Sequence, residues 1–95
     1  MKEVIISNLA QKENNQNVNY VFETFGLKVT LNYLDKYEEI ISLLESDFYN
    51  GTFDEKLKLY KILVVKQIYI LYENLDKNTI LIVSVWNNQQ FPYWF

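Results

Sequence analysis

The sequence contains no cysteine, no histidine and no arginine, and only two glycines and one proline occur among its 95 residues. Without cysteine and histidine, disulfide bonds, thiolate nucleophiles, imidazole bases and the common zinc ligand sets are all excluded. Without arginine, the chain has no planar guanidinium group that could hold a phosphate or a guanine edge with two parallel hydrogen bonds. These absences remove most common hydrolase chemistries, and we expect neither a metal site nor a cofactor.

The residues that are present fit one compact domain spanning residues 1–95. The chain is 49% hydrophobic and 17% aromatic, which is enough for one core but not for two. No apolar run reaches membrane-spanning length and residues 1–10 lack the core of a signal peptide, so we expect a cytoplasmic protein without membrane contact. The net charge of −3 also predicts no direct nucleic-acid binding by the protein alone, because phosphate contacts usually need a basic excess.

The first half of the chain predicts a short strand followed by a helical hairpin. Residues 2–7 form a β-branched run, after which Ser7 or Asn8 can cap a helix. Gly26 suits the left-handed residue that ends a helix, so a second helix is expected to begin directly after it. In the second half of the first helix, spacings of three and four residues predict one apolar stripe, made of Val18, Val21, Phe22 and Phe25.

The second helix is expected to pack one side on a sheet. Its predicted apolar side consists of Leu27, Leu31, Leu34, Ile41 and Leu44, widened by Tyr33, Tyr37 and Ile40. The opposite side is predicted to face solvent and carries Lys28, Asn32, Lys36 and Glu39, with Glu38 and Glu45 also solvated.

The second half of the chain has the period of β-strands. Residues 47–55 are turn-rich and link the helices to these strands. Alternation from Leu57 onward, and β-branched or aromatic runs at 62–65, 68–72 and 79–86, predict three sequential strands in an antiparallel meander, with a turn at 74–78. The predicted fold class is therefore α+β in the order β-α-α-β-β-β, a helical hairpin packed on one face of a small, mainly antiparallel sheet.

Four stretches match one family pattern in order and spacing. They are VIISNLA at 4–10, YVFETFGLKVTLNYLD at 20–35, YKILVVKQIYILYE at 60–73 and ILIVSVWNNQQFP at 80–92. Together they resemble the RelE/ParE superfamily of type II toxin–antitoxin toxins, also called plasmid-stabilisation proteins. The resemblance implies a growth-inhibiting toxin, a cognate antitoxin as its protein partner, and DNA gyrase or the ribosome as its target.

The chain departs from the family pattern near its end, where Gln89 stands at a position that usually holds arginine and Asn87 at one where aspartate is common. In ribonuclease members, cations and a late tyrosine act on the RNA, and the matching catalytic candidates here are Lys61, Lys66 and Tyr93. For both lysines, the favoured role is to blunt a sheet edge or to cover apolar surface with the side-chain stem. Because such a site needs cations to stabilise transition-state charge, we expect ParE-like gyrase inhibition, with RelE-like mRNA cleavage as the enzymatic alternative.

The last residues, FPYWF at 91–95, are unusually aromatic for a chain end. Pro92 bars further strand pairing, so these aromatics must cover the protein's own core or contact a partner. The residues predicted to bind a partner are Trp86, Gln89, Phe91, Tyr93, Trp94 and Phe95. Self-capping of the core stays open, as does the position of Trp86 in the core or on the surface. The alternative function is a family member that has lost toxicity and serves as a protein-interaction module.

Overall fold

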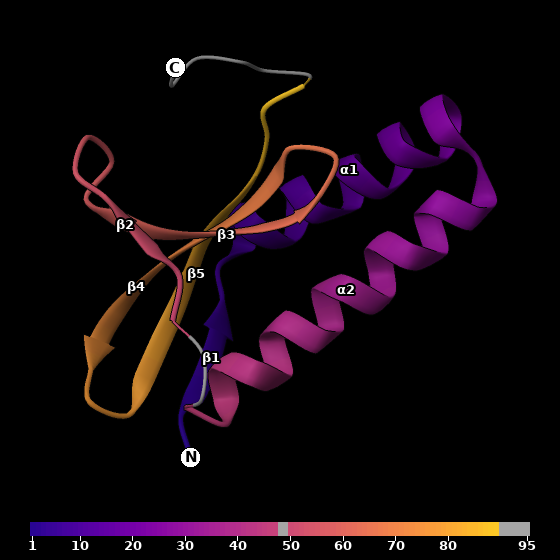
Figure 1. Ribbon diagram of the computed structural model, residues 1–95. Helices are drawn as coiled ribbons and strands as arrows, with labels where there is room; N and C mark the ends of the chain where they lie inside the picture. Colours follow the sequence, from indigo (N-terminus) through magenta and orange to yellow (C-terminus); the bar gives the residue numbers. More distant parts are fainter. Residues whose placement is uncertain (48–49, 90–95) are drawn as a thin grey trace.

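The computed structural model describes residues 1–47 and 50–89. Its strands form one sheet with the order β1-β5-β4-β3-β2, and both helices lie on the same side of this sheet (Figure 1). The α+β class with a helical hairpin on a mainly antiparallel sheet is therefore confirmed. The elements in chain order are β1 (Glu3–Ile6), α1 (Asn8–Phe25), α2 (Leu27–Glu45), β2 (Thr52–Asp54), β3 (Leu59–Val65), β4 (Ile68–Asp76) and β5 (Thr79–Asn87).

The first strand pairs with the last one. β1 runs parallel to β5 from the pair Glu3 and Thr79 to the pair Ile6 and Ile82, whereas the other neighbouring strands are antiparallel. Beyond this point no strand within the described residues pairs with that edge of β5, and side chains of α1 and of its capping residue Ser7 bind the β5 backbone instead. The Ser7 hydroxyl donates to the Val83 carbonyl over 3.0 Å, and the Glu13 carboxylate accepts from the Val85 amide over 3.1 Å. The helix therefore covers an edge that would otherwise expose unpaired backbone groups.

The first helix uses its polar residues for packing. Its buried side chains are Ala10, Asn14, Asn17 and Val21, while Phe22, predicted to lie on the packed stripe, is 53% exposed. Asn14 accepts a hydrogen bond from the Tyr33 hydroxyl of α2. The Ser7 hydroxyl caps the helix by accepting from the Ala10 amide over 3.0 Å, which confirms the predicted start. The weakly helix-forming first half of α1 is thus held by hydrogen bonds to neighbouring elements.

The packed side of α2 differs from the predicted one. Its buried residues are Thr30, Tyr33, Tyr37, Ile40 and Leu44. Leu27 and Leu31 are 61% and 52% exposed, so their assignment to the packed side was wrong. Leu31 follows Thr30 by one residue, which places it about 100° further around the helix. The two large tyrosines occupy the space above the sheet, and the leucines are turned to the flank.

Three predicted boundaries in the second half need correction. The segment at 47–55, predicted as a link, contains the short edge strand β2. β3 begins at Leu59 rather than near Leu57, because the Asp54 carboxylate accepts from the amides of Lys56 and Leu57 and holds a turn there. β4 continues to Asp76, so only the end of the predicted turn at 74–78 is a turn. The register of β4 with β5 shifts between Asn74 and Asp76. Because of this irregularity, the end of β4 lacks the regular alternation by which a strand is predicted from sequence.

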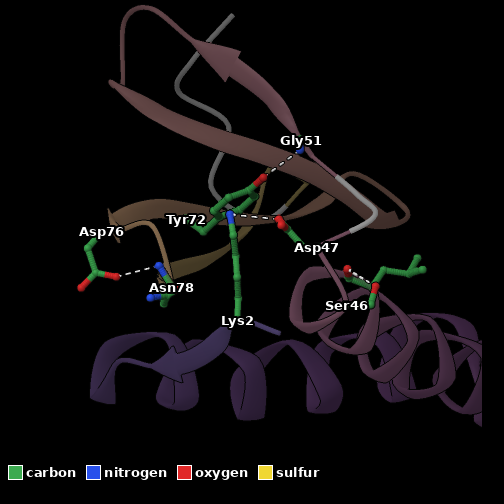
Figure 2. A network of polar contacts seen from close by, with 8 residues as sticks. Lys2, Ser46, Asp47, Gly51, Tyr72, Asp76 and Asn78 are labelled. Atoms are coloured by element: carbon green, nitrogen blue, oxygen red, sulfur yellow. Dashed lines mark hydrogen bonds and ion pairs between the residues drawn. The ribbon is translucent and has the colours of Figure 1, made fainter.

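Polar contacts tie the end of α2 and the start of β2 to the sheet (Figure 2). Lys2 forms an ion pair with Asp47 at 3.2 Å, and the Gly51 amide donates to the Tyr72 hydroxyl over 2.8 Å. Gly51 passes so close to β3 that a Cβ atom there would lie 2.6 Å from the Lys61 carbonyl oxygen. Gly26 has a φ of +88° between the two helices, as predicted for the hairpin. No helix in the described part of the chain is long and apolar enough to cross a membrane.

Candidate functional site

A row of large side chains crosses the sheet on the side that points away from the helices. Leu63 of β3 lies opposite Tyr69 of β4, and Tyr69 lies opposite Trp86 of β5. Successive side chains of a strand point to opposite faces, and the neighbouring residues Ile70 and Val85 belong to the core under the helices. Leu63, Tyr69 and Trp86 therefore form one outer row across three strands.

The outer row offers both apolar area and aromatic rings. Leu63 is 53% exposed, and Tyr69 and Trp86 are half-buried. Tyrosine and tryptophan combine a large apolar surface with a polar atom, which makes them frequent anchors of protein interfaces. The structure thus decides the position of Trp86, which lies outside the core cluster and in the outer row. Sequence analysis missed Leu63 and Tyr69, because regular pairing across a two-residue turn at 66–67 would place Val64 opposite Tyr69. The register shift between Leu63 and Val65 brings Leu63 to that position instead.

Lys61 lies next to the outer row on the same side of the sheet. Its ammonium nitrogen is 3.3 Å from the Asp54 carboxylate and 5.8 Å from the centre of the Tyr69 ring. The backbone amide of Leu57 lowers the pKa of Asp54, and the Lys61 side chain contributes in the same direction. Lys61 also lines a shallow cavity of about 370 Å³ at the β2 edge, together with Thr52, Phe53, Asp54, Glu55 and Lys56.

Lys66 occupies a different part of the molecule. It lies with Gln67 in the turn between β3 and β4, where both residues have positive φ angles, of 49° and 63°. Its ammonium nitrogen lies 5.0 Å from the centre of the Phe25 ring at the end of α1. The structure therefore does not bring Lys61 and Lys66 together, and the third catalytic candidate, Tyr93, falls outside the described residues. Among the described residues, only the pair Lys61 and Lys66 can be compared, and these two lysines contact different parts of the molecule.

The predicted partner-binding residues are only partly described. Gln89 accepts a hydrogen bond from the Tyr20 hydroxyl of α1 over 3.4 Å, and the neighbouring Asn88 amide donates to the Gln67 carbonyl over 2.9 Å. These contacts fix the point where the chain leaves β5, between α1 and the turn at 66–67. Trp86 lies in the outer row. The remaining residues of the predicted set, Phe91, Tyr93, Trp94 and Phe95, lie outside the described residues.

Comparisons with known proteins support the fold rather than a particular activity. No protein-family model matches the chain, and no curated protein matches it. Among solved structures, the chain is similar to one from the "Chromosomal ParDE TA system from P. aeruginosa", with a TM-score of 0.68 and 11% sequence identity. The similarity covers 90% of this chain and 94% of that one. The RelE/ParE-like fold implied by the four sequence stretches is thereby confirmed.

Proposed function

We propose that the protein is the toxin component of a toxin–antitoxin pair and inhibits growth by binding a macromolecular target. The observation that carries this proposal is the fold shared, over nearly the full length of both chains, with a chain of a ParDE toxin–antitoxin system. A fold alone does not define a function. The four family-like stretches of sequence add a second line of support.

Target binding, of the ParE-like kind directed at DNA gyrase, is favoured over RNA cleavage. Cleavage needs cations placed around the developing charge at phosphate. Lys61 is instead held by the Asp54 carboxylate at 3.3 Å, and Lys66 lies over the Phe25 ring at the end of α1. Because these two lysines contact different parts of the molecule, their positions support a protein that acts by binding rather than as an enzyme.

The outer row is the proposed contact with the target. Leu63, Tyr69 and Trp86 leave apolar and aromatic surface on a rigid sheet, and such surfaces supply most of the binding energy at interfaces. An antitoxin that contacts Trp86 and Gln89, with the aromatic residues after them, covers one end of this row. Antitoxin and target then compete for the same surface, which accounts for neutralisation without any further contact.

Inducible expression with and without the protein encoded next to this one tests the proposal. We expect growth arrest by the wild-type chain, relief of arrest by the neighbouring protein, and inhibition of gyrase supercoiling by the purified chain. Toeprinting of a translated message should show no codon-specific cuts. Arrest with such cuts, lost in Lys61→Ala, would establish mRNA cleavage instead, and normal growth despite antitoxin binding would establish the non-toxic interaction module.

Paired variants locate the contact. The double substitution Leu63→Ser and Tyr69→Ala should abolish growth arrest while the chain stays folded by circular dichroism. Leu75→Ser is the matched control, because Leu75 is 51% exposed near the β4–β5 turn, away from the outer row. Arrest that is unchanged in the double variant, or lost equally in the control, excludes the outer row as the contact.

A further inference from the structure

The flank of α2 carries a stripe of side chains that no described element covers. Leu27, Leu31, Asp35 and Glu38 follow one another at spacings of four, four and three residues, which places them on one face of the helix. All four are exposed, with Leu27 at 61% and Leu31 at 52%. The stripe begins at the tip of the helical hairpin, where α2 follows α1 (Figure 1). The exposed Phe22 lies in the last turn of α1. We call these four residues the α2 stripe.

The acidic half of the α2 stripe is electrically uncompensated. Within residues 1–47 and 50–89, neither Asp35 nor Glu38 takes part in an ion pair, whereas the neighbouring Glu39 pairs with Lys36 at 3.3 Å. Like charges three residues apart on a helix repel each other.

The α2 stripe is therefore apolar at one end and anionic at the other, and these properties define what it can bind. We propose that it binds an amphipathic helix of a partner protein, with aliphatic side chains facing Leu27 and Leu31 and lysine or arginine facing Asp35 and Glu38. The four residues span about 16 Å along the axis, which corresponds to about three turns of a bound helix. Cations on such a helix would replace the repulsion between the two carboxylates with two opposite-charge pairs.

The charges also argue against other occupants. Nucleic acid and anionic lipid surfaces carry negative charge, and the carboxylates of the α2 stripe repel both. The stripe lies on the helices, whereas the outer row lies on the far face of the sheet. This inference thus goes beyond the proposed toxin function and does not depend on it.

Selection from a phage-displayed library of helical peptides of about 14 residues tests the proposal. The full chain serves as the target, and a chain carrying Asp35→Lys and Glu38→Lys serves as the charge-reversed target. We expect the wild-type chain to enrich peptides with leucine-like residues two turns from lysine or arginine on one face. The charge-reversed chain should enrich aspartate or glutamate at those same basic positions.

The affinity of the best wild-type peptide, measured by calorimetry, gives a second readout. We expect a loss of about tenfold or more with the charge-reversed chain, and a clear loss with Leu31→Ser. Glu39→Gln is the matched control, because Glu39 lies on a neighbouring face, and it should leave the affinity nearly unchanged. Thermal unfolding of each variant confirms that it is folded. Selection of no peptide, selection of peptides without basic residues, or equal binding by the charge-reversed chain overturns the proposal.

Discussion

Asn17 of α1 donates a hydrogen bond from its side-chain amide to the backbone carbonyl of Val85 on β5 over 2.9 Å. Both groups are buried, and 68 residues separate them in sequence. Glu13 and Ser7 of the same part of the chain bind the neighbouring backbone groups of β5. Three polar side chains therefore bind the backbone of β5 along this edge, where no described strand pairs with it.

Removal of the Asn17 amide should destabilise the protein strongly. Asn17→Ala leaves the Val85 carbonyl buried without its donor and opens a small cavity, so we expect a loss of about 1–3 kcal/mol in the free energy of unfolding. Urea denaturation measures this loss. Asn19→Ala is the control, because Asn19 is exposed on the same helix. A loss as small as in the control would mean that the edge of β5 is not held by α1.

Two buried tyrosines of α2 should respond in opposite ways to loss of the hydroxyl. The Tyr33 hydroxyl donates to Asn14, whereas the Tyr37 hydroxyl is buried and has no hydrogen-bond partner among the described residues. Tyr33→Phe should therefore lower the free energy of unfolding by about 1–2 kcal/mol, and Tyr37→Phe should leave it unchanged or raise it. Urea denaturation of both variants checks the pair. A larger loss for Tyr37→Phe than for Tyr33→Phe contradicts this expectation.

A substitution in the β3–β4 turn should increase the stability of the protein. Gln67 has a φ of 63° in a two-residue turn, a conformation that glycine adopts more readily than glutamine. Gln67→Gly should stabilise the protein by about 1 kcal/mol, since the strain of a left-handed residue is relieved. Glu55→Gly serves as the control, because Glu55 lies in a turn but is not among the residues with positive φ, and there we expect destabilisation. Equal effects of the two substitutions on the melting temperature would contradict the assignment of strain.

Asp54 should contribute stability that disappears in acid. The Leu57 amide, followed by Lys61, lowers the pKa of Asp54 below its ordinary value of 3.8 in the folded state. A lowered folded pKa means that the contribution is complete above the ordinary value and is lost as the pH falls through the folded pKa. Asp54→Asn lacks this contribution at every pH. The difference in stability between wild type and variant should therefore be constant down to about pH 4 and then shrink. Urea denaturation across this range measures it, and parallel curves would contradict it.

The order of the elements after the first strand could be predicted because the hydrophobic period changes near residue 50. Helical spacing ends before residue 50 and strand alternation begins after it, so pattern alone predicts the α+β class and the antiparallel meander. The short strand β2 could not be found, since its residues Thr52–Asp54 stand among turn formers and are held by pairing with β3. The burial of the asparagines of α1 could not be predicted from the sequence either. Periodicity counts apolar residues, and Asn14 and Asn17 are buried because of the hydrogen bonds they make.

The residues of the candidate site could likewise be predicted only in part from the sequence. The sequence identifies Trp86 and Lys61 as individual candidates, but only the register of β3, β4 and β5 places Trp86 beside Tyr69 and Leu63. Likewise, Lys61 and Lys66 are five residues apart in sequence, yet one contacts Asp54 on the sheet and the other contacts Phe25 on α1. Leu27 and Leu31 were assigned to the packed side because of their helical spacing with the other apolar residues, although Tyr33 and Tyr37 fill that space. Such outcomes depend on competition between side chains for one volume, which no single-residue property records.

The pairing of β1 with β5 has a consequence for how the protein is made. Residues 3–6 are synthesised early, and their partners at 79–82 appear only after nearly all of the other described residues. Until then the backbone of β1, and the side chains of α1 that bind β5, have no acceptors or donors in place. Contacts between such distant segments form late and slow folding. A growing chain can therefore form its helices early, but it cannot complete the sheet, or the surface across β3, β4 and β5, before β5 has been translated.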